Sequence, residues 1–306
     1  MIDPGGTDQS VDLNGPRFSV IVPVYRHWAL VPELLAALEA QTIGAAAFEI
    51  LIVDNDPVGG LPGPASEIAL PGNARLLAER APGAYAARNA AAARARGRSF
   101  VFTDADCRPP PHWLAAFAAA EDAAGDGMAE EGEALLAGPI RMTWGTPPSS
   151  CELFEALRGI PQERYARNGY AATANLAVPA AVFRRLGGFD AGRFSGGDAD
   201  FCRRAGLPVR LVPEAVTRHP CRADWADLSR KIRRVKGGQI AAGSRRRRLA
   251  WTLRTLTPPV RALARFARAE APLAYRARAI GVLFALWGVE LAETARLLTG
   301  GRPERG

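Results

Sequence analysis

The sequence has few cysteines and no long apolar run, and each shortage excludes a class of protein. Its four cysteines show no C-x-x-C spacing, which argues against a zinc site and a disulfide framework, so we expect free thiols in a reducing compartment. The longest apolar run, 279–289, is about half of the roughly 20 residues that a membrane span needs. The polar residues 1–15 lack the basic start and apolar core of a signal peptide. We therefore expect a cytoplasmic protein.

Two glycine-rich nucleotide-binding motifs are also absent. A dinucleotide dehydrogenase needs Gly-x-Gly-x-x-Gly after the first strand, where this chain has PVYRHW at 23–28. A P-loop enzyme needs Gly-Lys-Ser/Thr, and the chain contains no such triplet. These two types of nucleotide-using enzyme are excluded.

Lysine is scarce, yet the chain is strongly basic. Lys231 and Lys236 are the only lysines, and arginine gives the formal net charge of +8 and the pI of about 9.9. Basic residues gather after residue 200, with four consecutive arginines at 245–248, which favours a patch for phosphates, anionic lipid or nucleic acid. Nucleic acid is disfavoured because 229–248 contains no aromatic residue to stack on a base. A peripheral contact with the inner face of a membrane stays open, beside the commoner case of a solvated face.

Strand and helix signals alternate through the first third of the chain. Continuous apolar runs, typical of strands buried on both faces, lie at 18–25, 48–53 and 99–103, with a weaker candidate at 74–77. Helical spacing at 31–38 and 84–96 separates them. This order predicts an α/β fold with a mostly parallel central sheet flanked by helices.

The rest of the chain changes character at about residue 240. Before that point we predict helices and strands at 112–124, 135–144, 172–178, 179–186, 209–212 and 224–235. Residues 145–170 show few periodic signals, and we expect them to be irregular. Beyond residue 240 only helical patterns follow, broken at Pro258-Pro259 and Pro272. We therefore expect a disordered N-terminus (1–16), an α/β domain (17–240) and a C-terminal helical extension (241–306).

Several aspartates follow predicted strands. Asp54, Asp104 and Asp106 stand at strand ends, and ligands of α/β sheets bind beyond the carboxyl ends of the strands. Two carboxylates there can hold one divalent cation through oxygen ligands. Asp-x-Asp alone is a weak motif, and turn-forming or solvated aspartates are the alternative.

An ordered set of segments resembles the family 2 glycosyltransferases. They are FSVIVPVY at 18–25, ILIVDN at 50–55, GAYAARNAAAARARG at 83–97, FVFTDADC at 100–107, TANLAVPAAVFRRLGGFD at 173–190 and GGDADFCRR at 196–204. Each segment alone is weak evidence, whereas the ordered set is specific and covers about residues 17–240. The resemblance implies a GT-A fold. It also implies transfer of a sugar from a UDP-, GDP- or dTDP-linked donor to an unidentified acceptor hydroxyl.

The resemblance assigns donor contacts to four residues. Pro23 and Tyr25 would line the pocket of the nucleotide base, and Asp54 would bond the base or the ribose. Arg88 would lie near the nucleotide. The alternatives are a core aromatic for Tyr25, a turn-forming carboxylate for Asp54 and a structural ion pair or solvated helix face for Arg88.

The resemblance also assigns the metal and the base. Asp104 and Asp106 would hold Mg²⁺ or Mn²⁺ on the diphosphate, and His219 would add a metal or phosphate contact. Asp198 would take the proton of the acceptor hydroxyl in a single inverting displacement. A structural histidine is the alternative for His219, and a helix cap is the alternative for Asp198, with Asp200 as its competitor.

Two departures from the family's pattern narrow the prediction. Gly197 stands where the family usually has Glu, so the base loses an acidic neighbour, and a catalytically degenerate scaffold remains an alternative. The processive Gln-x-x-Arg-Trp signature and the membrane spans of polysaccharide synthases are absent. This favours transfer of a single sugar, in the glycosylation of cell-surface glycans, glycolipids or natural products.

Overall fold

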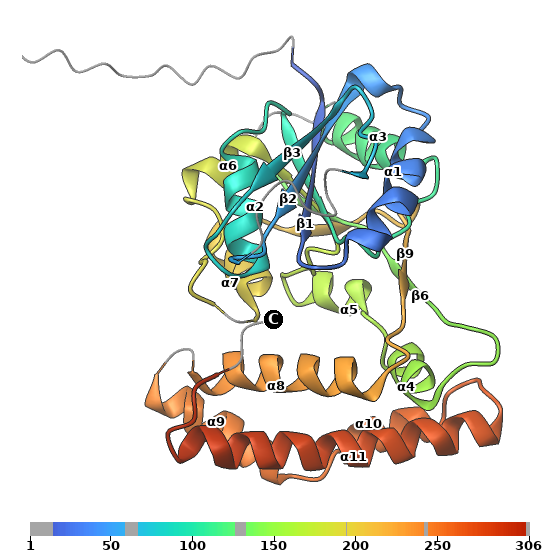
Figure 1. Cartoon of the computed structure of the whole chain (residues 1–306), viewed down its shortest axis with the longest axis vertical. Helices are drawn as coiled ribbons and strands as arrows, with labels where there is room; N and C mark the ends of the chain where they lie inside the picture. Colours follow the sequence, from blue (N-terminus) through green and yellow to red (C-terminus); the bar gives the residue numbers. More distant parts are fainter. Residues whose placement is uncertain (1–14, 59–66, 126–132, 194, 242–243, 304–306) are drawn as a thin grey trace, which may run out of the picture.

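A seven-stranded sheet forms the centre of the computed structural model, which describes residues 15–58, 67–125, 133–193, 195–241 and 244–303. The strand order is β3-β2-β1-β4-β7-β5-β8, and most neighbouring pairs are parallel, which confirms the predicted α/β fold (Figure 1). The disorder predicted for residues 1–16 falls, up to residue 14, outside the described residues.

Four parallel strands build one half of the sheet. They are β3 (Ala74–Ala78), β2 (Phe48–Asp54), β1 (Phe18–Val24) and β4 (Ser99–Thr103). Their apolar runs suit strands that are covered on both faces. Because β2, β1 and β4 run in the same direction, their carboxyl ends meet at one edge of the sheet. Asp54, the last residue of β2, and the aspartates that follow β4 therefore lie at the same edge.

The other half of the sheet mixes directions and corrects one prediction. β7 (Asn175–Pro179) is antiparallel to β4 and to β5 (Leu135–Ala137), and β8 (Val209–Leu211) runs parallel to β5. A separate parallel pair joins β6 (Ile140–Thr143) to β9 (Thr217–Pro220), a strand that the sequence pattern did not predict. The single strand predicted at 135–144 is thus wrong. The chain turns at Gly138, where a Cβ atom would overlap the carbonyl oxygen of Ala215.

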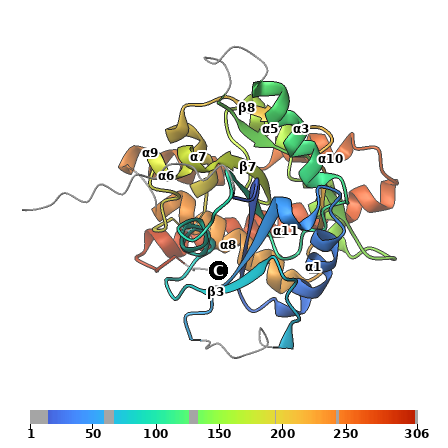
Figure 2. The same ribbon diagram turned by 90° about the horizontal axis from the view of Figure 1, so that it is seen from above.

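Helices cover both faces of the sheet. On one face lie α1 (Val31–Glu39) and α3 (Trp113–Gly125), and on the other lie α2 (Ala84–Ala92), α6 (Ala180–Arg185) and α7 (Gly197–Ala205) (Figure 2). Successive β1 residues serve the two cores in turn, since Val20 packs with α1 and α3 while Ile21 packs with α2, α6 and α7. The short 3₁₀ helices η1 (Trp28–Leu30) and η2 (Ala45–Ala47) precede α1 and β2.

A layer of helices lies below the carboxyl edge of the sheet (Figure 1). We call it the helical layer; it consists of α4 (Ser150–Arg158), α8 (Trp225–Ala241), α9 (Arg245–Leu256), α10 (Val260–Ala267) and α11 (Leu273–Leu298). Its core includes Phe154, Leu228 and Phe266. No helix among the described residues combines the length and the apolarity needed to cross a membrane.

The helical layer corrects a second prediction, that 145–170 is irregular. α4 begins in a capping box in which Ser149 and Glu152 satisfy each other's backbone N–H groups, and α5 (Gln162–Arg167) follows. Both helices lie within the stretch predicted to be irregular. The boundary between domains at residue 240 stays a prediction. α8, which lies before that boundary, packs against α9 and α11, which lie after it.

Candidate active site

Two carboxylates lie in the turn that follows β4. The turn is fixed to the neighbouring β9 by a short antiparallel bridge, in which Arg108 N donates to Arg218 O (2.8 Å) and Arg218 N donates to Arg108 O (3.2 Å). This bridge joins segments far apart in the sequence. It brings His219, the next residue of β9, beside Asp104 and Asp106.

Asp104, Asp106 and His219 form a three-residue cluster. Each offers one ligand atom, and these atoms all lie within 4.8 Å of one another. His219 Nδ1 lies 2.8 Å from the carbonyl oxygen of Pro220 and can only donate to it. In the neutral ring, Nε2 therefore carries a lone pair, and it lies 3.5 Å from Asp106 Oδ2. A cation placed between these two acceptor atoms could be bound by both.

The free atoms of this cluster fit a divalent cation. Within the described part of the chain, the buried Oδ1 of Asp106 has no hydrogen-bond partner. A buried acceptor without a partner is costly unless a ligand satisfies it. Carboxylate oxygens and an imidazole nitrogen are ligands that Mn²⁺ accepts, and Mg²⁺ is also bound through carboxylates.

A buried arginine contacts the first carboxylate. Arg88 Nη2, on α2, lies 2.5 Å from Asp104 Oδ1, and the Arg88 side chain is only 4% exposed whereas that of Asp104 is 35% exposed. The ion pair considered as the alternative for Arg88 is thus present. The same guanidinium places a fixed positive charge beside the cluster.

Asp198 lies in the first turn of α7. Its Oδ1 accepts a hydrogen bond from the N–H of Ala199 (2.9 Å), and among the described residues it forms no ion pair. Burial raises the pKa of Asp198, although the Ala199 N–H and the charge of Arg88 act to lower it. A carboxylate with a raised pKa is suited to take up a proton.

Asp200, the alternative to Asp198 as the base, is paired with two arginines. Asp200 forms ion pairs with Arg193 (2.7 Å) and Arg204 (3.1 Å). Both carboxylate oxygens of Asp200 are used in these contacts. Of the two aspartates at the start of α7, Asp198 is therefore the one without an ion pair among the described residues, and its role as the base stays a prediction.

Tyr85, which the sequence reading did not single out, caps α7. Its hydroxyl oxygen accepts from the N–H groups of Gly197 (2.9 Å) and Asp198 (3.4 Å). A Cβ atom at position 197 would lie 2.6 Å from Cε2 of the Tyr85 ring, so the ring occupies the space of any side chain there. Gly197 is thus accounted for by packing. No local signal could join these residues, which are 112 positions apart.

The predicted nucleotide contacts lie at the ends of β1 and β2. Asp54 is buried, and its Oδ2 lies 3.3 Å from Arg80 Nη1. Pro23 is part of β1, and the half-exposed ring of Tyr25 lies beyond it, 4.9 Å from the guanidinium carbon of Arg26. The roles of Pro23, Tyr25 and Asp54 in donor binding stay predictions.

Asn55 is a second residue that the sequence reading missed. Its Nδ2 donates to the carbonyl oxygens of Glu79 and Ala81 (both 2.8 Å), and its Oδ1 accepts from the N–H of Gly83 (2.8 Å). These bonds hold the loop that leads from β3 into α2. Asn55 therefore sets the start of the helix that carries Tyr85 and Arg88.

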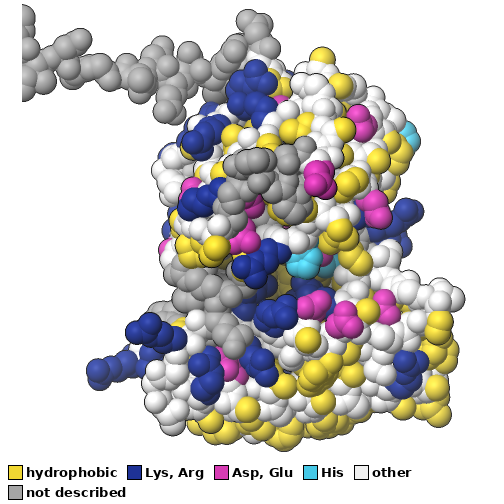
Figure 3. Space-filling view, viewed as in Figure 1, with side chains coloured by type: hydrophobic (Ala, Val, Ile, Leu, Met, Phe, Trp, Pro, Cys, Tyr) yellow, Lys and Arg dark blue, Asp and Glu magenta, His cyan; other side chains and the backbone are white. Residues whose placement is uncertain are grey.

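The helical layer contributes a further arginine to the site. Burial lowers the pKa of Arg234, on α8, while the nearby Tyr85 and Asp104 raise it. Basic, acidic and histidine side chains gather at the waist between the sheet and the helical layer (Figure 3). α8 thus carries a charge that interacts with Asp104 across this waist.

A buried charge cluster lies within the helical layer. Glu155, on α4, accepts from Lys231 Nζ (2.6 Å) and from the N–H of Arg222 (2.8 Å). Burial raises the pKa of Glu155, but these two cations outweigh it and bring the pKa to about 2. Burial lowers the pKa of Lys231 to about 8. This cluster ties α4, α8 and the segment after β9 together.

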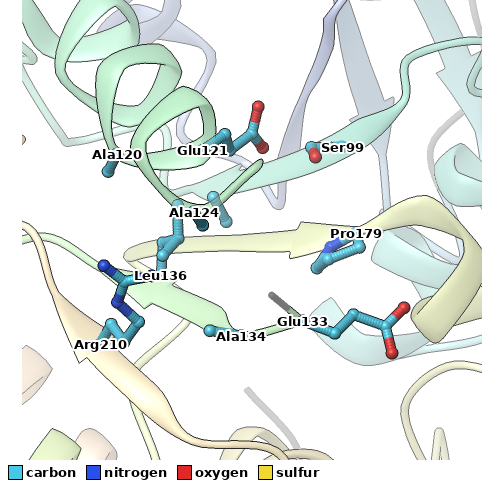
Figure 4. A pocket seen from close by; sticks show the side chains of 10 residues that line it. Ser99, Ala120, Glu121, Ala124, Glu133, Ala134, Leu136, Pro179 and Arg210 are labelled. Carbon is cyan, nitrogen blue, oxygen red and sulfur yellow. The ribbon is translucent and has the colours of Figure 1, made fainter. Parts of the chain in front are cut away.

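A surface pocket of about 230 Å³ lies at the opposite edge of the sheet (Figure 4). It is lined by Ser99, Glu121, Glu133, Leu136 and Arg210, among others. Ser99 begins β4, whereas Asp104 follows its last residue. This pocket is therefore separate from the carboxylates.

Comparison with known proteins gives a family and a relative. Residues 19–129 match the model of the family described as Glycosyl transferase family 2. Glycosyltransferase AglE of Haloferax volcanii is 28% identical over 299 residues, which cover 93% of this chain and 96% of the relative. These matches confirm the predicted family resemblance.

Solved structures give the fold. Mannosyltransferase PcManGT from Pyrobaculum calidifontis, solved in complex with GDP-Man and Mn²⁺, is 21% identical with a TM-score of 0.53, covering 92% of this chain and 85% of that one. Residues 1–349 of S. aureus TarS, solved with UDP-GlcNAc, are 16% identical with a TM-score of 0.54, covering 93% and 92%. The chain spans 43% of the longer TarS chain. These likenesses confirm the GT-A fold.

Proposed function

We propose that this chain, a glycosyltransferase with a family 2 domain, transfers a single sugar from a nucleotide-diphosphate sugar to an acceptor hydroxyl with inversion. The observation that carries the proposal is the cluster of Asp104, Asp106 and His219 at the carboxyl edge of the sheet. Arg88 connects this cluster to the proposed base, since it bonds Asp104 and its charge opposes the burial that raises the pKa of Asp198. Metal ligands, a positive charge and a general base thus belong to one site.

Asp104, Asp106 and His219 would hold the divalent cation, Mg²⁺ or Mn²⁺. When bound, such a cation supplies Lewis-acid neutralisation of the diphosphate. Arg88 and Arg234 add fixed positive charge on the same leaving group. The relative PcManGT was solved with GDP-Man and Mn²⁺, which supports this choice of metal and donor class.

Asp198 acts as the base in the proposed reaction. Its carboxylate takes the proton of the acceptor hydroxyl as that oxygen forms a bond to the anomeric carbon. The bond from the anomeric carbon to the diphosphate oxygen breaks, and the nucleoside diphosphate leaves with the bonding electrons. Attack on the face opposite the leaving group inverts the anomeric centre. Tyr85 holds the backbone of Asp198 during this step.

Pro23, Tyr25 and Asp54 are proposed to bind the nucleoside of a UDP-, GDP- or dTDP-sugar. They lie at the carboxyl ends of β1, which neighbours β4, and of β2, the next strand along, at the same edge as the metal ligands. A nucleoside there would lie at the same edge of the sheet as its diphosphate.

A donor panel tests the proposal. UDP-, GDP- and dTDP-sugars are incubated with the protein and Mn²⁺, and release of nucleoside diphosphate is measured with and without EDTA. We expect release from at least one donor, its loss with EDTA and its loss in Asp104→Asn. Asp122→Asn, an exposed carboxylate paired with Arg17, is the control and should keep activity. Donor binding without release would favour a degenerate scaffold, and release that is insensitive to EDTA would exclude the metal role.

A further inference from the structure

The outer side of α9 presents a row of leucines to solvent. Leu249, Leu253 and Leu256 are spaced by four and three residues, so they lie on one side of the helix. Their exposed fractions are 60%, 56% and 59%. Arg245 and Arg246, also exposed, flank this row on the helix surface. Exposed leucines in a row are uncommon on a soluble surface and mark a contact site.

The opposite side of α9 is fixed to the rest of the helical layer. Thr255 is buried, and its Oγ1 accepts from Lys236 Nζ (2.9 Å). The carbonyl oxygen of Thr255 accepts from Trp287 Nε1 (2.8 Å). These bonds anchor α9 to α8 and α11, so the leucines must face outward.

The outer side of α11 is also uncharged. Between Arg278 and Arg296 every exposed residue is small or apolar: Gly281, Phe284, Ala285, Gly288, Ala292 and Ala295. Val282, Leu283 and Leu286 on the other side pack into the core of the layer. Hydrophobic side chains line the lower border of the molecule, where the C-terminal helices lie (Figure 3).

The charge around these apolar faces has one sign. Residues 244–303 contain 12 arginines and three glutamates. Two of the glutamates are already paired, Glu290 with Lys236 (3.0 Å) and Glu293 with Arg296 (2.6 Å). The surface thus combines exposed apolar side chains with uncompensated positive charge.

We propose that the outer faces of α9 and α11 rest on a membrane surface that carries anionic lipid. Leucines at the level of the headgroups and flanking arginines are what an interfacial helix uses on such a surface. A second copy of the chain fits less well, because a two-fold contact would bring the arginines of both copies together. Nucleic acid would use the arginines and leave the leucine row without a partner. The inference is independent of the proposed sugar transfer.

Vesicle sedimentation tests the proposal. The full chain is mixed with vesicles of phosphatidylcholine alone or with added phosphatidylglycerol. We expect binding only with phosphatidylglycerol, and a loss of at least about tenfold in affinity for the triple variant Leu249→Ser, Leu253→Ser, Leu256→Ser. Val58→Ser is the matched control, since Val58 is 86% exposed and lies beside the sheet, and it should bind like the unchanged protein. Equal binding of the triple variant, or no vesicle binding by the unchanged protein, would overturn the proposal.

Tryptophan fluorescence gives a second readout that does not depend on the triple variant. Trp251 lies on α9, partly exposed, with the guanidinium of Arg254 5.4 Å from its ring. Lipids brominated near the headgroup should quench this residue on binding, and Trp251→Phe should remove most of the quenching. Quenching that is unchanged in Trp251→Phe would show that another face meets the bilayer. Light scattering of the unchanged protein in solution checks the self-association alternative, and a stable dimer lost in the triple variant would contradict the proposal.

Discussion

The carboxyl edge of the sheet and the helical layer below it use buried charge differently. At the sheet edge, within the described residues, Asp106 Oδ1 has no partner and Asp198 forms no ion pair. In the helical layer, Glu155 is satisfied by Arg222 and Lys231. Among the described residues, a buried acceptor without a partner, such as Asp106 Oδ1, marks a place for a ligand, and a carboxylate without a counter-charge, such as Asp198, can take up a proton. A satisfied buried charge instead holds elements together. Substitutions in the two regions should therefore affect different quantities.

Asp198→Asn should have the largest effect and should act mainly on the chemical step. Removing a general base costs about 10²–10⁴-fold in turnover. Donor binding should persist because the metal cluster is untouched. The measurement is the rate of sugar transfer beside donor affinity. Asp200→Asn, in the same helix turn but paired with two arginines, is the matched control. Transfer that survives in Asp198→Asn would show that the base lies elsewhere.

Glu155→Gln should have the opposite signature, a loss of stability. It leaves the partly exposed Lys231 and Arg222 without their counter-charge, and breaking an ion pair at a buried carboxylate costs up to about 3–5 kcal/mol. Denaturant unfolding measures this loss, and Glu33→Gln, 74% exposed, is the control. Because the folded pKa of Glu155 is lowered to about 2, its contribution is present above its unfolded pKa and fades as the pH falls toward 2. An unchanged free energy of unfolding would mean that the cluster is not structural.

Tyr85→Phe tests the hydrogen bonds by which Tyr85 holds the start of α7, where Asp198 lies. It removes the acceptor of two N–H groups at the start of α7, and an unsatisfied buried N–H costs about 1–3 kcal/mol. We expect kcat to fall by about tenfold with little change in donor KM, because the base is displaced and the metal ligands are not. Tyr275→Phe, in the helical layer, is the control. A rise in KM at constant kcat would contradict a positioning role.

The pH profile should show the smallest effect. Burial raises the pKa of Asp198, and the base must be ionised to act, so kcat should fall on the acid side with a midpoint above the ordinary value of about 4. Because the pKa of Asp198 is higher in the folded protein than in the unfolded chain, ionisation of Asp198 at neutral pH disfavours the folded state. Asp198→Asn should therefore be slightly more stable at neutral pH. Rate profiles and thermal unfolding measure the two effects. An acid limb at or below pH 4, or a destabilised Asn variant, would contradict the assignment.

The sheet edge was predictable because its signals are local. The apolar runs of β1, β2 and β4 predict strands buried on both faces. Because these strands are parallel, Asp54 and Asp104 lie at one edge of the sheet. The contact of Asp106 with His219 could not be predicted from local signals, because it depends on the bridge between Arg108 and Arg218. Only the family resemblance pointed to His219.

The remaining errors arise where distant segments decide the local structure. The apolar pattern continues through Gly138, and only the nearby Ala215 backbone explains why β5 and β6 separate. The Ser149-x-x-Glu152 signature of α4 was present in the sequence, but the helix buries its face against α11, more than a hundred residues later. The role of Gly197 likewise depends on Tyr85.

Manganese titration tests the central claim, that the ends of β4 and β9 build one cation site, most directly. Mn²⁺ is added to the protein in the presence of UDP or GDP, and free Mn²⁺ is followed by its paramagnetic resonance signal. We predict one tightly bound ion per chain, with affinity reduced by at least about tenfold in both Asp106→Asn and His219→Gln. Asp122→Asn, an exposed carboxylate outside the ligand set and paired with Arg17, should bind like the unchanged protein. Binding that is insensitive to both ligand substitutions, or no bound ion at all, would contradict the account.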